Sequence, residues 1–440
     1  MNNVSIDFNN VKGKIKVMHA VNNGPVVAGP DQTRGNQNYF KAARIPYART
    51  HDASFWAGYG GSHTIDVHSI FPNFYADADD ENSYDFACTD LYIKQIFQYG
   101  SKPFYRLGSK IEHEVKKYGT VMPPDFKKWA IICEHIIAHY TKGWANGFNY
   151  DIEYWEIWNE PDLDPDESTN KRCWSGTEKE FAEFYAVAAT HLKACFPDLK
   201  IGGPASCGDE AWMKRFLDRI KGKNVPLDFL SWHWYWTMPE DIAIKADRIK
   251  GLLIDAGYEN SESILNEWNY VRDWSVEFVY SIKQIIGMKG AAFTAACMSV
   301  GQHNENVDML MYYDARPGTF NGLFDYYTMM PLKGYYPFFI YSKLYELENC
   351  VYSETDDELL YAVGATDGKK IGAMVTYYSE NDNVNSKTVT IELKGCDLEG
   401  VKLYLVDEDY SYNEILNYTI LDGSKIKIRL ERNSILYIER

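Results

Sequence analysis

Short apolar runs alternate with longer amphipathic stretches from about residue 14 to about residue 335. The runs are rich in β-branched and aromatic residues, which indicates strands. The longer stretches repeat apolar residues at three- and four-residue spacing, which indicates helices. Residues 126–144 and 178–196 show this helical spacing most clearly. Strands that alternate with helices predict an α/β fold with a parallel sheet.

Eight of the apolar runs qualify as strands, with helical stretches between them. Eight parallel strands, each followed by a helix, make up a (β/α)8 or TIM barrel. We therefore predict such a barrel over residues 14–342. The predicted strands lie at residues 14–23, 47–52, 102–108, 152–161, 200–205, 229–236, 263–270 and 308–316.

The pattern changes at about residue 343. Short runs of alternating polar and apolar residues follow one another, separated by Asp-Gly, Asn-Asp and Gly-Ser turns. This pattern predicts an antiparallel β-sandwich over residues 343–440. Residues 4–10 alternate in the same way, so we expect residues 1–13 to join that second domain.

Composition restricts the partners. The net charge of −17 opposes binding to nucleic acid or to an anionic membrane, since both require clustered Lys and Arg. Aromatic residues make up 15% of the chain. Their flat faces and polar tips suit a surface that stacks on sugar rings as well as a large core. We expect no nucleic acid and no membrane among the partners.

The cysteines are scattered without a Cys-x-x-Cys pair, which favours free thiols in a reducing compartment over disulfides or a zinc site. The first ten residues lack the basic start and apolar run of a signal peptide, and no apolar stretch reaches the roughly 20 residues that span a bilayer. We therefore expect a cytoplasmic protein. The cysteines stand at positions 88, 133, 173, 195, 207, 297, 350 and 396.

Three histidines near two aspartates raise the question of a metal site. His51, His63 and His68 stand close in sequence to Asp52 and Asp66. Their spacing fits no compact set of metal ligands. We therefore predict no metal and no cofactor.

Ionisable residues stand at the ends of several predicted strands, where enzymes with this fold place their chemistry. Glu160 follows the fourth strand, and Pro161 ends the pairing there because it has no N–H to donate. Glu267 stands in the seventh strand between Asn266 and Trp268. We expect the two glutamates to face each other across the mouth of the barrel.

Two facing carboxyl groups can hydrolyse a glycosidic bond. In a retaining enzyme one protonates the leaving oxygen while the other attacks the anomeric carbon, at a separation of roughly 5–5.5 Å. An aromatic surround keeps the acid protonated near neutral pH, whereas hydrogen bonds keep the nucleophile ionised. Strand alternation also predicts that Glu156, Trp158 and Glu160 point to one side of the fourth strand.

Short motifs carry a family resemblance. They include Asn159-Glu160-Pro161, Arg49-Thr50-His51-Asp52 and Ile70-Phe71-Pro72. With them the chain resembles glycoside hydrolase family 39, in the large clan of retaining enzymes with catalytic glutamates on strands four and seven. The first motif is shared across the clan, and the other two point more narrowly to this family. Further matching segments are 65–67, 84–86, 106–108, 155–162, 202–204, 231–235 and 265–269.

The resemblance implies specific roles for the residues at the strand ends. Glu160 is expected to be the general acid/base and Glu267 the nucleophile. Asn159 is expected to hydrogen-bond the sugar 2-hydroxyl, a contact that strengthens at the transition state. The resemblance also implies a barrel joined to a β-sandwich accessory domain.

The same resemblance places His51, His233 and Tyr235 around the terminal sugar and lets Tyr235 hold the nucleophile ionised. His233, which stands among tryptophans, is also typical of a satisfied core histidine. One departure follows strand eight, where xylosidases of the family usually carry an acid-rich segment with a Trp. Residues 311–317 offer Asp314 there as a replacement sugar contact. This departure weakens the prediction of β-xylosidase activity more than the prediction of a glycosidase in general.

We therefore expect a retaining exo-glycosidase that hydrolyses terminal bonds of plant-type oligosaccharides by double displacement, similar to a β-xylosidase. An α-L-arabinofuranosidase or a transglycosylase of the same family, and a non-catalytic carbohydrate-binding barrel, stay open as alternatives. The long loop over residues 53–90 is expected to shape the substrate pocket. The sugar, the linkage, the anomeric configuration and the assembly of a homo-oligomer stay open.

Overall fold

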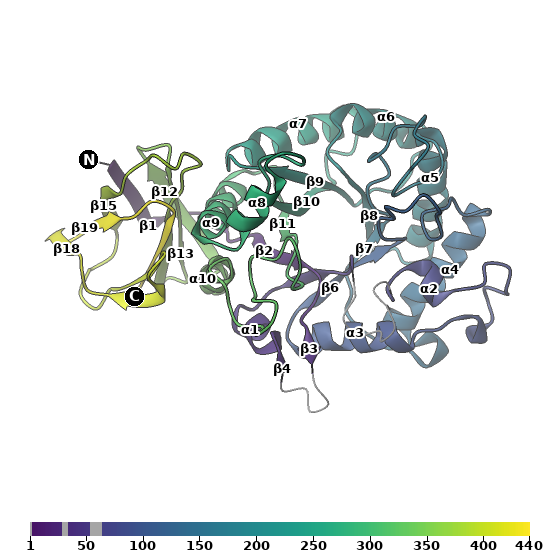
Figure 1. The fold of residues 1–440 in the computed structure, drawn as a ribbon, viewed down its shortest axis with the longest axis horizontal. Helices are drawn as coiled ribbons and strands as arrows, with labels where there is room; N and C mark the ends of the chain where they lie inside the picture. The colour runs from purple at the N-terminus through teal and green to yellow at the C-terminus, as the bar shows by residue number, and fades with distance from the viewer. Residues whose placement is uncertain (1, 29–33, 53–63) are drawn as a thin grey trace.

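The structure is a computed structural model that describes residues 2–28, 34–52 and 64–440 (Figure 1). It contains a closed barrel and a large sheet that lie side by side (Figure 1). Residues 53–63 of the predicted long loop, which include His63, lie outside the described residues.

Eight parallel strands close into the barrel in the order in which they follow along the chain, and β11 pairs with β2 to complete the ring. Each of them overlaps one predicted strand, which confirms the (β/α)8 barrel. Because all eight run in the same direction, their carboxyl ends meet at one rim. The strands are β2 (Val17–Asn22), β5 (Tyr47–Arg49), β6 (Lys102–Leu107), β7 (Tyr154–Ile157), β8 (Lys200–Ser206), β9 (Phe229–Trp236), β10 (Glu262–Tyr270) and β11 (Met309–Tyr312).

Helices return the chain between these strands, and capping residues set their ends. Thr177 and Glu180 form a reciprocal capping box at the start of α5, and the Asp125 side chain accepts two backbone N–H bonds at the start of α4. Gly143, with φ 73°, ends α4 in the left-handed conformation that favours glycine. The long helices are α3 (Ala87–Gln98), α4 (Phe126–Lys142), α5 (Glu178–Cys195), α6 (Glu210–Lys221), α7 (Asp241–Asp255), α8 (Phe278–Ile285), α9 (Met288–His303) and α10 (Tyr335–Glu346).

Among the described residues, none of the helices is both long enough and apolar enough to cross a membrane.

Short helices and strands lie in the connections between the longer elements. The short elements are α1 (Gln37–Ala42), α2 (Val67–Ile70), the 3-10 helices η1 (Glu81–Ser83) and η2 (Trp144–Asn146), and the paired strands β3 (Val27–Ala28) and β4 (Arg34–Gly35).

The second unit is a ten-stranded sheet in the order β17-β16-β20-β14-β13-β12-β1-β15-β19-β18. The first strand of the chain, β1 (Asn2–Lys14), lies inside it, antiparallel to β12 and parallel to β15. The sheet is therefore mostly antiparallel, as predicted, and departs from that prediction at one pair. The other strands are β12 (Asn349–Thr355), β13 (Leu360–Thr366), β14 (Ile371–Tyr377), β15 (Lys387–Lys394), β16 (Lys402–Val406), β17 (Ser411–Ile415), β18 (Thr419–Asp422), β19 (Lys425–Leu430) and β20 (Ser434–Glu439).

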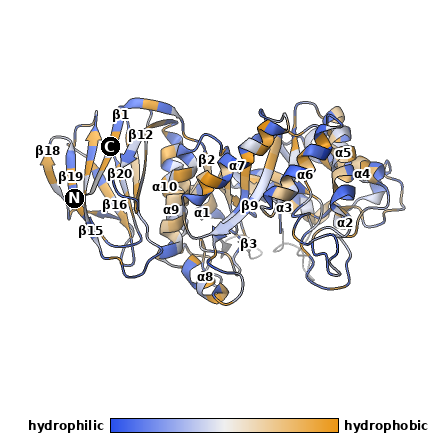
Figure 2. Ribbon diagram, turned by 90° about the horizontal axis from the view of Figure 1, so that it is seen from above, coloured by the Kyte–Doolittle hydropathy of each residue, from blue (hydrophilic) through white to orange (hydrophobic). Residues whose placement is uncertain are grey.

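Helices α9 and α10 lie between the barrel and the sheet (Figure 2). Nearly every residue of α9 is buried, including small ones such as Gly290 and Ala295. A helix that is apolar on all sides needs partners on all sides, and here the barrel and the sheet supply them. Helix α10 continues across residues 342 and 343, where the two predicted domains meet. The bounds of the two domains therefore stay a prediction.

Candidate active site

The rim at the carboxyl ends of the strands brings Glu160 and Glu267 together. One carboxylate oxygen of each, and one ring nitrogen of His233, lie within 4.8 Å of one another. Glu160 comes from the loop after β7, His233 from β9 and Glu267 from β10. Carboxyl groups this close fit the separation of roughly 5–5.5 Å in retaining glycosidases better than the roughly 6.5–9.5 Å in inverting ones.

The turn after β7 aims Glu160 inward. Strand pairing stops at Ile157, and both Trp158 (φ 76°) and Glu160 (φ 45°) adopt left-handed backbone conformations. The alternation therefore breaks, and Trp158 packs outside the barrel against Trp129 and Phe184. The prediction that Trp158 shares a side with Glu156 and Glu160 is wrong, because regular alternation requires extended backbone.

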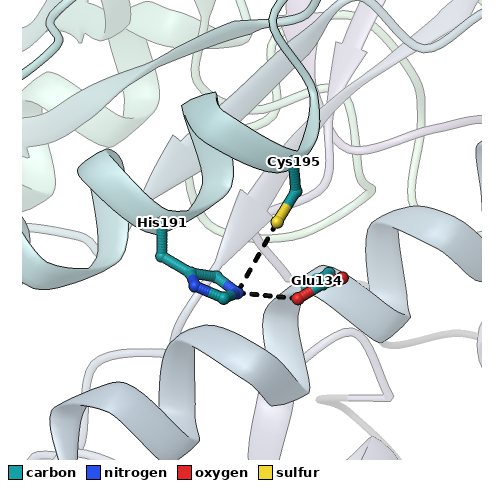
Figure 3. Close-up of side chains that lie close together, drawn as sticks. All are labelled: Glu134, His191 and Cys195. Atoms are coloured by element: carbon teal, nitrogen blue, oxygen red, sulfur yellow. Dashed lines mark hydrogen bonds and ion pairs between the residues drawn. The ribbon is translucent and has the colours of Figure 1, made fainter.

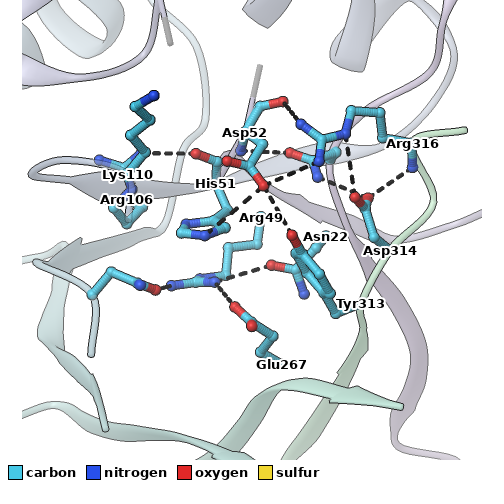
Figure 4. Close-up of polar contacts among 12 residues, drawn as sticks. Asn22, Arg49, His51, Asp52, Arg106, Lys110, Glu267, Tyr313, Asp314 and Arg316 are labelled. Carbon is cyan, nitrogen blue, oxygen red and sulfur yellow. Dashed lines mark hydrogen bonds and ion pairs between the residues drawn. The ribbon is translucent and has the colours of Figure 1, made fainter. Parts of the chain in front are cut away.

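Arg49, on β5, connects the two glutamate-bearing strands (Figure 4). Its guanidinium donates to Glu156 at 2.7 Å, to Glu267 at 3.0 Å, to Asn159 at 2.7 Å and to Asn22 at 3.0 Å. The Arg49 and Glu156 side chains are fully buried. The rigid fork of an arginine holds several acceptors in one geometry, so Arg49 fixes the nucleophile relative to β7.

Sequence reasoning gave no role to Arg49 or Glu156. Each stands inside a predicted strand, at a position that the barrel buries. A buried charge is costly unless it is paired, so the available signal was two opposite charges in two interior strands that have one strand between them. Their pairing needs the closed barrel, which brings β5 and β7 to either side of β6.

Donors hold both oxygens of the Glu267 carboxylate. The Tyr235 hydroxyl donates to Oε1 at 2.6 Å, while Arg49 donates to Oε2 and His233 Nε2 lies 3.6 Å from that oxygen. Burial raises the pKa of Glu267, and His233, Arg49 and Tyr235 each oppose that rise. These contacts favour the ionised carboxylate that a nucleophile requires.

The Glu160 carboxyl has a different environment. Burial raises its pKa to about 7, against the opposing effects of Arg49 and Arg172. Its Oε1 is hydrogen-bonded to His233 Nδ1 at 2.8 Å, and the Cys173 thiol lies 3.9 Å from Oε2. Burial lowers the pKa of His233 to about 4, so this imidazole is neutral at neutral pH. A carboxyl group that titrates near 7 can donate and take back a proton there.

A cavity of about 680 Å³ opens over the two glutamates. The predicted site residues His51, His233 and Tyr235 lie on its wall together with Glu160 and Glu267. A pocket of this size accommodates a small ligand of a few rings. Aromatic and aliphatic side chains complete much of the remaining wall: Ile111, Leu163, Trp234, Trp274, Phe278 and Phe320.

Two further predicted site residues lie behind that wall. Asn159 is buried next to Glu160, with its Oδ1 bound by Arg49. Asp314 is also buried, and its carboxylate accepts from Asn23 at 2.7 Å and lies 3.3 Å from Arg316 (Figure 4). The structure therefore brings Asp314 to the side of the site but occupies its carboxylate with Asn23 and Arg316, and its role as a sugar contact stays a prediction.

Part of this barrel is similar in sequence to known proteins. The sequence model of "Glycosyl hydrolases family 39" matches residues 36–250, from α1 through most of α7. A β-xylosidase from Caldicellulosiruptor saccharolyticus is 31% identical over 175 residues, which are 37% of this chain and 32% of that protein. Residues 36–250 of the chain are thus similar to glycoside hydrolase family 39. The matched segment spans about a third of the length of that relative.

One further sequence relative and two solved structures of the same fold are similar to the chain. A β-xylosidase from Geobacillus stearothermophilus is 31% identical over 150 residues, which are 33% of this chain and 28% of that protein. A glucosidase from Croceicoccus marinus shares the fold, with a TM-score of 0.79 and 22% identity over 100% of this chain and 98% of that one. An α-L-arabinofuranosidase from Thermotoga maritima does so with a TM-score of 0.70 and 15% identity over 100% of both chains.

Proposed function

We propose that this chain, which resembles family 39, is a retaining exo-glycosidase that releases one terminal sugar from short oligosaccharides. The observation that carries the proposal is the pair of close carboxyl groups, Glu160 and Glu267, with contrasting surroundings. One titrates near neutral pH, and the other is held by a hydroxyl and a guanidinium. This contrast is what acid catalysis and nucleophilic attack require.

The reaction proceeds in two displacements. In the first, Glu267 attacks the anomeric carbon while Glu160 gives its proton to the leaving oxygen, so that a glycosyl ester forms and the aglycone departs. In the second, Glu160 takes a proton from water, and the water oxygen replaces the ester oxygen at the anomeric carbon. Both glutamates return to their starting states, and the anomeric configuration is retained.

Asn159 is suited to bind the sugar 2-hydroxyl. Arginine has only donors, so the oxygen of the Asn159 amide must face Arg49. The amide NH2 is then the group left for a sugar hydroxyl. A donor fixed in this way strengthens its contact as positive charge develops at the anomeric carbon.

Unsatisfied polar atoms on the cavity wall favour a hydroxyl-rich ligand. His51 Nδ1 and Trp234 Nε1 are buried and have no hydrogen-bond partner among the described residues. Both residues line the cavity. Buried polar atoms normally have partners, and sugar hydroxyls can serve both of these because a hydroxyl donates as well as accepts.

β-Xylosides are the first substrates to test, since two relatives in sequence are named β-xylosidases. α-L-Arabinofuranosides come second, because a fold relative is an arabinofuranosidase. Transfer of the glycosyl group to a sugar instead of water uses the same two glutamates, and product analysis separates the two outcomes. In the cytoplasm that we infer for this chain, short imported oligosaccharides are the natural substrates.

A nitrophenyl glycoside panel tests the activity, with xyloside, arabinofuranoside, galactoside and glucoside included. We expect turnover of at least one glycoside, and NMR of the first-formed sugar to show the anomer of the substrate. Glu160→Ala is expected to lose most activity on substrates with poor leaving groups and to be partly rescued by azide. An inverted product, or full activity of Glu160→Ala on an oligosaccharide, contradicts the mechanism. No turnover of any glycoside favours a carbohydrate-binding barrel.

A further inference from the structure

A second cluster of ligand-type side chains lies outside the barrel, between helices α4 and α5. His191 and Cys195 stand four residues apart on α5, which places them on the same face of that helix. Glu134 points toward them from α4 (Figure 3). One ligand atom of each residue lies within 4.8 Å of the other two.

The distances are close to those of a metal site. Glu134 Oε2 lies 2.7 Å and Cys195 Sγ 3.8 Å from the same atom, His191 Nε2 (Figure 3). Zinc holds N, O and S ligands at bond lengths of roughly 2.0–2.3 Å, so tetrahedral ligand atoms stand roughly 3.3–3.8 Å apart. The sulfur–nitrogen distance already fits, and the oxygen–nitrogen distance needs to open by less than about 1 Å.

The three side chains lie where an ion can reach them from solvent. The His191 and Glu134 side chains are 33% and 32% exposed, so an ion can enter from solvent and keep water as a further ligand. All three residues belong to long helices that pack against each other. None of them lines the cavity over Glu160 and Glu267.

The ligand types select the class of ion. A thiolate, an imidazole and a carboxylate together suit zinc and cobalt better than magnesium or calcium, which prefer oxygen ligands alone. We propose that Glu134, His191 and Cys195 bind one divalent ion of the zinc type, which joins α4 to α5. Since the ion binds only where the two helices are packed, it stabilises the folded barrel.

Cobalt titration of the reduced, full-length protein tests the site, because cobalt reports its ligands by colour. We expect a thiolate-to-cobalt charge-transfer band that saturates at one ion per chain and disappears when zinc is added. Cys195→Ser is expected to lose the band and to bind zinc at least about tenfold more weakly. Zinc is expected to raise the Tm of the wild type and to leave that of Cys195→Ser unchanged.

Two cysteine variants serve as controls. Cys88→Ser removes another partly buried thiol, and Cys173→Ser removes the thiol beside Glu160. Both are expected to keep the band. Glu134→Gln is a second test that leaves the thiol in place, and it is expected to weaken zinc binding. The proposal is overturned if the wild type gives no band, if Cys195→Ser keeps it, if Cys173→Ser loses it, or if Glu134→Gln binds zinc like the wild type.

Discussion

The hydroxyl of Tyr235 donates a 2.6 Å hydrogen bond to Oε1 of Glu267. The two residues stand on the neighbouring strands β9 and β10. Arg49 holds the second oxygen of the same carboxylate. The orientation and the charge of the nucleophile therefore depend on two other strands of the barrel, β5 and β9.

Tyr235→Phe tests this dependence. Loss of a hydrogen bond to a charged group costs about 1.5–3 kcal/mol, so we expect kcat to fall about 10- to 100-fold. The hydrogen bond lowers the pKa of Glu267, so its removal raises that pKa. The acidic limb of the pH–kcat/KM profile is then expected to move to higher pH. The control Tyr258→Phe removes a hydroxyl bound to the Val225 carbonyl and is expected to change neither kcat nor the acidic limb. An unshifted acidic limb in Tyr235→Phe would falsify the role of Tyr235 in holding Glu267 ionised.

Arg172→Met tests the acid. Activity requires protonated Glu160, so it is expected to fall as the pH rises through about 7. Arg172 lowers the pKa of Glu160, whereas Asp164, its salt-bridge partner, raises it. Removal of Arg172 takes away one effect that lowers the pKa of Glu160 and leaves the charge of Asp164, which raises it, without its partner. The pKa is then expected to rise, and the alkaline limb to move to higher pH. pH–rate profiles measure this shift. Arg215→Met, on the outer surface, is the control with no expected shift, and a limb that moves to lower pH contradicts the assignment.

Arg49→Lys tests the buried charge network. A lysine ammonium cannot match the geometry of four acceptors, so Glu156 loses its charged partner and keeps the Asn266 amide as a donor. We expect a loss of unfolding free energy of about 3–5 kcal/mol, the usual result of breaking a buried ion pair. Denaturant unfolding measures it. Arg219→Lys changes an exposed ion pair with Glu178 and is expected to cost less than about 1 kcal/mol. Equal losses in the two variants would refute the network.

Trp274→Ala tests the outer part of the cavity. This side chain is 59% exposed and lies against Tyr235, Phe278 and Phe320. An exposed ring at a cavity mouth can stack on the sugar beyond the cleaved bond. We expect a KM raised about 5- to 50-fold for oligosaccharides and an almost unchanged kcat. Tyr327→Ala removes an exposed ring that does not line the cavity, and its KM is expected to match the wild type. If the KM of Trp274→Ala equals that of the wild type, stacking of a sugar on this ring is excluded.

The strands and the two glutamates were predictable because each leaves a local signal. An apolar run that ends in Asn159-Glu160-Pro161 specifies both the strand and its end. Trp158 was placed wrongly because its positive φ breaks the alternation, and nothing in the local sequence requires a left-handed tryptophan. That conformation is stabilised by tertiary contacts with Trp129 and Phe184.

The partners of Arg49 and Asp314 were less predictable. Arg49 bonds side chains from β2, β10 and the β7 segment at once, and such a network exists only after the barrel closes. Asp314 was predicted as a sugar contact from its position after strand eight. Its hydrogen bond from Asn23 depends on the segment after β2, at the other end of the barrel sequence, whereas its ion-pair partner Arg316 is only two residues away.

Strand β1, which precedes the barrel in the chain, pairs with β12 and β15 in the interior of the ten-stranded sheet. Its register spans residues separated by more than three hundred positions along the chain, such as Val4 with Thr355 and Ile391. Residues 2–14 therefore have neither of these partner strands until residues 349–394 have been synthesised. Closing so long a loop is slow. During translation the waiting segment is open to capture by chaperones, and the sheet assembles only after the barrel residues have emerged.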